Sequence, residues 1–306
     1  MITEYKKLKI TELSQLKAVI DELNELNKLN KFKDEEGKIR WIFRGDKKYD
    51  DEEASIKSSL ERFFCLERIE PGKKRKEVED ELIREFKRAY HQYAYHLPDP
   101  DSTVEWLSLM QHHGAPTRLV DFTYSVYVAA YFALEDALQM KDKSGEYIVW
   151  AINSVWANKN SLKTLRKKYS KVSKTLDILA KPATDSPKLI KAQGTFFKEP
   201  FARFAFPQNP FRLNERLRIQ KGVFVLQGDL NSPFMGNLKA LIGNEKGTNI
   251  FQIELDKYKR SELLKELHHM NITRTSLFPG LDGYAKSLGV YLPRLKDILR
   301  KRKRRA

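Results

Sequence analysis

The chain lacks the features that stabilise secreted proteins or anchor proteins in a membrane. Its 306 residues include a single cysteine, Cys65, so it forms no internal disulfide, as expected in a reducing compartment. No run approaches the roughly 20 consecutive apolar residues that a bilayer span requires, and the first ten residues lack the apolar stretch of a signal peptide. We therefore expect a cytoplasmic protein without a membrane partner.

Proline and glycine are also scarce, with 12 and 14 residues that are scattered and not clustered. Hydrophobic residues make up 41% of the chain and aromatic residues 11%, which excludes a disordered protein. Because a domain typically has about 100–200 residues, the length allows one large domain or a core with an appendage.

Acidic residues are outnumbered by basic ones, 41 against 57, which gives a net charge of +16 and a sequence pI near 9.6. An excess of this size favours a polyanionic partner, DNA or RNA first. Part of it is concentrated in Arg300–Arg305. This run either binds phosphates through counterion release or is a solubilising terminus, and composition leaves both alternatives open.

The apolar periodicity predicts alternating helices and strands. Leu13, Leu16, Val19 and Leu23 have helical spacing, whereas residues 146–153 are apolar on both faces, which is typical of a central strand. We expect helices over 11–26, 77–95, 104–110, 124–140 and 261–270, and strands over 39–44, 117–123, 146–153, 222–227 and 248–255.

These elements indicate an α/β (α+β) fold, a single domain built around a mixed sheet flanked by helices. We expect an N-terminal helical cap at 1–30, the main domain at 31–292 and a basic tail at 293–306. Within the main domain, residues from about 155 to 214 contain five prolines and read as an insertion of helices and an irregular surface loop.

Two concentrations of polar residues are candidates for a site. Alternation from Ile39 predicts a strand that stops at Gly45 and carries Arg44 at its end, on the face opposite Trp41. Residues 111–123, QHHGAPTRLVDFT, are dense in hydrogen-bonding side chains although they lead into a strand. Arg118 and Asp121 could simply pair with each other, but such clusters usually line a pocket. We expect Arg44 and this block to converge on one cleft.

Other chemistries have weaker support. His112-His113 and His268-His269 are adjacent pairs whose side chains point apart, so neither has metal-ligand spacing, and we expect no metal. Asp46, Asp121 and His112 could in principle serve a metal-dependent nuclease. The chain has no phosphate-loop, dinucleotide-binding or nucleophile-elbow motif.

Five short segments give the chain a family resemblance over roughly residues 20 to 292. They are Phe43-Arg44-Gly45-Asp46, the block 111–123, the helix segment 129–133, residues 216–224 and Leu277-Phe278-Pro279-Gly280-Leu281-Asp282-Gly283. In these segments the chain resembles the FRG domain family, whose chemistry is poorly defined. The resemblance therefore implies a fold more firmly than a reaction.

A looser resemblance is to mono-ADP-ribosyltransferases, which place Arg-Gly at a first strand and hydroxyls at a later strand end before a helix. Arg44-Gly45 and Phe122-Thr123-Tyr124-Ser125 are similar to these elements. The resemblance implies NAD as a substrate and catalytic roles for Arg44, Thr123, Ser125 and Gln220. It also implies cofactor-binding roles for Arg44, Gly45, Gln111, His112, Thr117, Arg118 and Asp121.

One element of that pattern is missing, because Gln220-Lys221-Gly222 stands where a glutamate would stabilise the developing cation. Glu215 and Glu254 are possible substitutes without support from spacing. Two functions follow as hypotheses. One is an ADP-ribosyltransferase-like effector that modifies nucleic acid or protein, in stress or antiviral defence. The other is a non-enzymatic nucleic-acid or nucleotide-binding module. The sequence does not name the acceptor, the trigger or the oligomeric state.

Overall fold

The computed structural model describes most of the chain. The described residues are 6–26, 31–47, 55–94, 97–139, 146–169, 176–180, 186–199, 201–212, 214–242 and 249–288. The expected basic tail, Arg300–Arg305 included, lies outside them. No helix within these ranges combines the length and apolar character that crossing a bilayer requires.

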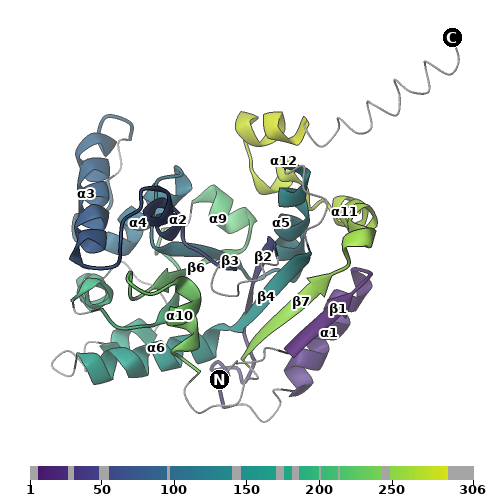
Figure 1. Cartoon of the computed structure of the whole chain (residues 1–306), viewed down its shortest axis with the longest axis horizontal. Helices are drawn as coiled ribbons and strands as arrows, with labels where there is room; N and C mark the ends of the chain where they lie inside the picture. Colours follow the sequence, from purple (N-terminus) through teal and green to yellow (C-terminus); the bar gives the residue numbers. More distant parts are fainter. Residues whose placement is uncertain are drawn as a thin grey trace, which may run out of the picture.

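Seven strands within these ranges form one mixed sheet in the order β1-β7-β4-β2-β3-β6-β5 (Figure 1). The strands are β1 (Lys6–Ile10), β2 (Trp41–Lys47), β3 (Leu119–Thr123), β4 (Tyr147–Asn153), β5 (Ala205–Gln208), β6 (Gly222–Gln227) and β7 (Ile250–Leu255). The β1–β7 pair is parallel and the other neighbours are antiparallel. The expected mixed α/β sheet is thus confirmed.

Helices flank this sheet near the expected positions. They are α1 (Ser14–Leu26), α2 (Ser59–Leu66), α3 (Lys73–Tyr90), α4 (Thr103–His112), α5 (Val126–Gln139), α6 (Ser154–Lys168), α8 (Pro187–Gln193), α9 (Glu215–Ile219), α10 (Phe234–Lys239), α11 (Arg260–His269) and α12 (Arg274–Leu277). Three short 3₁₀ helices, η3 (Asp177–Ala180), η4 (Gly194–Phe197) and η5 (Lys257–Lys259), complete the described set. Residues 281–288 are also helical.

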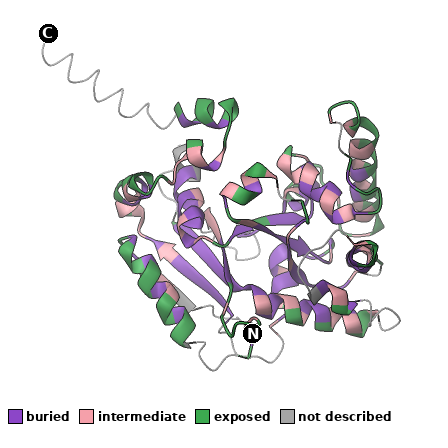
Figure 2. Cartoon of the chain, turned by 180° about the vertical axis from the view of Figure 1, so that it is seen from behind, coloured by how far each residue is buried: buried purple, intermediate pink, exposed green. Residues whose placement is uncertain are grey.

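The sheet has a hydrophobic core on each face. Because strand side chains alternate, Val149 and Ala151 of β4 pack with α1, α5 and α11, whereas Trp150 and Ile152 pack with α4, α6 and α10. All seven residues of β4 are buried, as expected for a central strand. Figure 2 shows the strands almost entirely buried and the outward faces of the helices exposed.

Two expectations about the sheet were wrong. Strand β2 does not stop at Gly45, because its pairing with β4 continues to Lys47 opposite Tyr147. Arg44 therefore lies inside the strand. The insertion expected at about 155–214 does contain helices, α6 and α8, but its remainder is not only an irregular surface loop, since it supplies β5 at the edge of the sheet and the core residues Phe196 and Phe206. The N-terminal segment likewise adds β1 to the expected helix.

The sheet splits between β2 and β3, and this split determines where the site lies. β3 pairs with β6 along all five of its residues, but it meets β2 only where Phe43 faces Thr123. Beyond Phe43, β2 continues along β4 alone. The sheet is therefore open beside Arg44.

A buried carboxyl on α2 makes the stability of this fold depend on pH. The Oε2 of Glu61 accepts a hydrogen bond from the backbone N of Phe234 at 3.1 Å, and burial raises its pKa from 4.5 to about 7. A raised carboxyl pKa stabilises the fold at low pH, and this stabilisation is lost between pH 4.5 and 7. We expect Glu61→Gln to be more stable than the parent above pH 7, by up to about 3 kcal/mol. Thermal unfolding from pH 4 to 8 measures this.

The matched control is Glu67→Gln, which removes an exposed carboxyl at the other end of α2. It should leave the pH profile unchanged. A stability difference between Glu61→Gln and the parent that stays constant across the pH range would contradict the buried-carboxyl interpretation.

Candidate functional site

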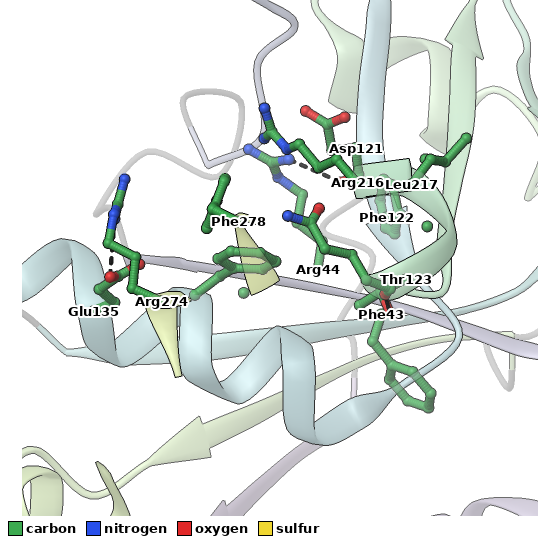
Figure 3. A pocket seen from close by; sticks show the side chains of 14 residues that line it. Phe43, Arg44, Asp121, Phe122, Thr123, Glu135, Arg216, Leu217, Arg274 and Phe278 are labelled. Atoms are coloured by element: carbon green, nitrogen blue, oxygen red, sulfur yellow. Dashed lines mark hydrogen bonds and ion pairs between the residues drawn. The ribbon is translucent and has the colours of Figure 1, made fainter. Parts of the chain in front are cut away.

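A pocket of about 300 Å³ occupies the split between β2 and β3. It lies between α9 on one side and α5 and α12 on the other (Figure 3). Its charged lining residues are Arg44, Asp121, Glu135, Arg216 and Arg274, and its aromatic ones are Phe43, Phe122, Phe132 and Phe278. Cations are in excess, three to two, so the pocket is suited to an anionic ligand.

Arg44 bridges the two strands where they separate. Its NH1 donates to the carbonyl oxygen of Asp121 at 2.9 Å, and its Nε donates to Oδ2 of Asp46 at 3.2 Å. The side chain is about one-fifth exposed. Because a guanidinium has five N–H donors, these two bonds hold Arg44 at the pocket and leave donors for a ligand.

Thr123 and Gln220 line the same pocket and are joined by a hydrogen bond. The hydroxyl of Thr123 donates to the carbonyl oxygen of Gln220 at 2.7 Å and accepts from the backbone N of Ser125 at 3.0 Å. The Nε2 of Gln220 donates to the carbonyl oxygen of Leu277 at 3.0 Å. Gln220 lies at the C-terminal end of α9, just before β6, and its amide joins that turn to α12.

Ser125 does not line the pocket. Its hydroxyl accepts from the backbone N of Val128 at 3.3 Å and so satisfies the first turn of α5. Its contribution in the structure is to begin the helix that forms one wall.

Gly45 lines the pocket, and packing is what requires it to be glycine. A Cβ on Gly45 would lie 1.9 Å from the carbonyl oxygen of Ala129 and 2.5 Å from the backbone N of Ala133. Both are backbone atoms of α5 and cannot rotate away. The pairing of Gly45 with the two alanines therefore allows α5 to lie directly on β2.

Asp121 is oriented by a chain of hydrogen bonds from the same polar block. The Nε2 of Gln111 donates to Oδ2 of Asp121 at 2.7 Å, and Oε1 of Gln111 accepts from the hydroxyl of Thr117 at 2.6 Å. Thr117 is fully buried behind Gln111 and lies outside the pocket. Ser59 of α2 closes the network by donating to Oε1 of Gln111 at 3.2 Å.

Gln111 and His112 border a smaller hollow of about 20 Å³ that shares Asp121, Arg216 and Gln220 with the main pocket. Burial lowers the pKa of His112, and the neighbouring His113 and Arg216 lower it further. These effects favour the neutral imidazole of His112. Its Nδ1 is buried and has no hydrogen-bond partner among the described residues.

Arg118 does not reach the site, contrary to expectation. It is fully buried, and its Nε donates to Oε1 of Glu79 in α3 at 2.5 Å. Its NH1 donates to the carbonyl oxygens of Gln227 and Gly228. Arg118 and Asp121 are three residues apart, and an odd spacing places extended side chains on opposite faces. The anticipated pairing between them is thus replaced by a buried Arg118–Glu79 pair.

Nine of the lining residues were not foreseen as site residues, and four of these, Glu135, Arg216, Arg274 and Phe278, are joined by ion-pair or cation–π contacts. Glu135 is buried and accepts from NH1 of Arg274 at 2.8 Å and from the hydroxyl of Tyr131 at 2.9 Å. The guanidinium groups of Arg216 and Arg274 lie 4.6 and 4.8 Å from the ring centre of Phe278. Arg216 and Phe278 belong to the segments that carry the family resemblance, and this membership was the only signal in the sequence that could have marked them as site residues.

The proposed substitutes for the missing glutamate lie elsewhere. Glu215 is in the first turn of α9 and does not line the pocket, and Glu254 lies in β7 opposite Ile148 of β4. Among the described residues, the carboxylates that line the pocket are Asp121 and Glu135. No group of three or more His, Cys, Asp or Glu side chains within the described ranges is placed to hold a metal ion.

The fold and site define a mixed α/β domain with a cationic pocket in a split sheet. The family model described as the FRG domain matches residues 39–142, which include Arg44 and the block 111–123. This match supports the FRG resemblance over about a third of the chain. No curated protein and no solved structure matches the chain. The comparisons do not show the looser resemblance to mono-ADP-ribosyltransferases, which stays a hypothesis.

The contact of Gln220 with Leu277 predicts the effect of restoring a glutamate. In Gln220→Glu a carboxylate would face the carbonyl oxygen of Leu277, and neither group donates. We expect a loss of about 1–3 kcal/mol in unfolding free energy at pH 7, because a buried acceptor is left unsatisfied. The loss should shrink below pH 4, where a protonated Glu can donate. Urea unfolding at both pH values measures it.

Gln220→Met is the control, since it removes the hydrogen bond without adding charge and should be less destabilising at pH 7. A Gln220→Glu variant that is as stable as the parent and releases more nicotinamide from NAD would contradict this interpretation. It would show that position 220 is the vacant glutamate position.

Proposed function

We propose that the pocket binds NAD and transfers its ADP-ribosyl group to nucleic acid or protein. The observation that carries this proposal is the meeting of Arg44, Asp121, Thr123 and Gln220 in one cationic pocket at the split between β2 and β3. A strand-borne Arg near a strand-to-helix junction with hydroxyl groups is the arrangement that the resemblance implies for NAD.

Two guanidinium groups support binding of the diphosphate. Arg44 is held by Asp46 and the Asp121 carbonyl, whereas Arg216 stacks on Phe278 and forms no ion pair within the described part of the chain. A guanidinium binds phosphate oxygens bidentately. The charge of Arg274, in contrast, is compensated by Glu135. The ring of Phe278 offers an apolar surface for a planar nicotinamide or adenine.

The transfer requires a carboxylate near the reacting carbon. The bond between C1′ of the ribose and the nicotinamide nitrogen breaks, and its electron pair leaves with nicotinamide. A nucleophile of the acceptor then bonds to C1′ and gives up its proton to water. We assign stabilisation of the cationic ribose to Asp121, which is exposed and oriented by Gln111. Glu135 is less suited, since Arg274 and Tyr131 already occupy its Oε1.

A second candidate function is binding of a nucleotide or nucleic acid without cleavage. The observation that favours it is the commitment of Gln220 to the Leu277 carbonyl, which leaves no glutamate at the position that the resemblance requires. A role in stress or antiviral defence and a cytoplasmic location are compatible with either function and stay proposals.

Substitution of Arg44 tests the proposed reaction. We expect Arg44→Ala to weaken NAD binding by at least tenfold and to lower nicotinamide release by 100-fold or more, because the diphosphate loses its fixed cation. Asp121→Asn should retain NAD binding and lose nicotinamide release, because the Asn side chain keeps the shape of Asp but lacks the negative charge that would stabilise the cationic ribose. Calorimetry measures the binding, and chromatography of free nicotinamide measures the reaction in the presence of nucleic acid.

Arg84→Ala, which removes an exposed Arg of α3, is the matched control and should change neither quantity. If the parent protein fails to bind NAD even with nucleic acid present, the transferase proposal is wrong and the binding module remains. If NAD binds without any nicotinamide release, the second candidate function is supported.

A further inference from the structure

A second and larger cavity, of about 770 Å³, lies next to the end of β3 and the start of β6, which also line the pocket. Thr123 lines the pocket, and the next residue, Tyr124, lines this cavity. Likewise Gly222 lines the pocket, and the next residue, Val223, lines this cavity. Thr123 pairs with Gly222 across β3 and β6. The two hollows therefore adjoin at this end of the two strands, where consecutive side chains point to opposite faces of the sheet. We call the second one the α6 groove, because α6 forms one of its walls.

The wall formed by α6 is strongly basic. The helix has five Lys and Arg residues and no Asp or Glu, and all four of its lysines, Lys159, Lys163, Lys167 and Lys168, are exposed. Lys159 and Arg166 line the groove itself. Arg166 forms an ion pair with Asp177 at 2.5 Å. For the other four cations, α6 itself offers no acidic partner. Along the lower edge of the molecule in Figure 1, α6 therefore presents a positive strip.

The opposite wall, residues 33–40, carries three acids, and two of them are neutralised within their own loop. Asp34 accepts from Nε of Arg40 at 2.5 Å and from two backbone N–H groups, and these contacts hold its pKa below the usual range. Glu36 pairs with Lys38 at 3.0 Å. Glu35 thus remains as one acid against the positive strip of α6.

The floor of the groove is suited to bases. Tyr124 is 42% exposed, so its ring is available for stacking. Asn158, Gln208 and Asn209 line the groove with side-chain amides, which both donate and accept hydrogen bonds. The Oδ1 of Asn209 is buried and has no hydrogen-bond partner within the described residues.

We propose that the α6 groove binds single-stranded nucleic acid, with phosphates along α6 and bases against Tyr124 and the amides. A duplex would present mainly its phosphates and leave Tyr124 and the amides unused, so a single strand fits the groove better. Delivery of this strand as the acceptor beside the pocket rests on the proposed transfer reaction, whereas the binding itself does not. This surface lies within the described part of the chain.

Charge reversal on α6 tests the proposal in the full chain. We expect Lys159→Glu/Lys163→Glu to weaken binding of a fluorescein-labelled 12-nucleotide single strand by more than tenfold at about 0.1 M salt. The slope of log affinity against log salt should become shallower, since fewer counterions are released. Lys73→Glu/Lys74→Glu, the same charge change at exposed positions of α3, is the control and should have less than a threefold effect. Fluorescence anisotropy measures both, with RNA and DNA strands in separate titrations.

Tyr124→Leu adds a test that does not involve charge. It should weaken single-strand binding about tenfold through lost stacking and leave duplex binding unchanged. The proposal is wrong if the α6 and α3 variants lose the same affinity for the single strand. It is also wrong if Tyr124→Leu or the α6 variant binds the single strand as tightly as the parent. An acceptor that proves to be protein, with no nucleic-acid binding to the parent, would overturn it as well.

The outcomes separate this proposal from the proposed function. Single-strand binding that depends on α6, without nicotinamide release, supports the groove and contradicts the transferase. NAD binding and nicotinamide release that are unaffected in the α6 variant, with no strand bound by the parent, support the transferase and contradict the groove.

Discussion

The contact of α5 with β2 at Gly45 is the constraint on which the site depends. With no side chain at this position, the backbone of α5 comes so close that any Cβ would lie 1.9 Å from the Ala129 carbonyl oxygen. This contact positions one wall of the pocket, because α5 also carries Phe132 and Glu135. It also brings Thr123, just before the helix, beside β2. A larger residue at position 45 would displace all of these together.

Two buried ion pairs hold the other elements around that contact. Arg118 and Glu79 join the start of β3 to α3, and Arg274 and Glu135 join α12 to α5. Buried pairs contribute little net stability, but losing one partner is costly, since the other charge stays buried and unpaired. Both pairs therefore keep separate parts of the chain in one arrangement. The polar groups that face a ligand are Arg216, which forms no ion pair within the described residues, and the exposed carboxylate of Asp121, whose Oδ2 is oriented by Gln111.

The sequence predicted most helices and strands, since long amphipathic segments and the doubly buried β4 have clear periodicities. It also predicted that Arg44 and the block 111–123 would meet. The failures have physical causes. The end of β2 is set by pairing with β4, which alternation within β2 cannot reveal. Strand β5 has only four residues and lies among prolines, so only its pairing with β6 defines it as a strand. Glu135 lies in an alanine-rich helix and has no local pattern that marks it.

By itself the sequence determined the mixed α/β class, the glycine that allows α5 onto β2, and the residue types of the cationic pocket. These are local properties, since periodicity and the absence of a Cβ act over a few neighbouring residues. Only the tertiary structure decided which polar residues serve the pocket and which serve the core. Arg118 and Arg44 have the same side chain, but Arg118 meets a carboxylate 39 residues away in the sequence and is buried with it. Arg44 lies where two strands separate, and so it faces the pocket.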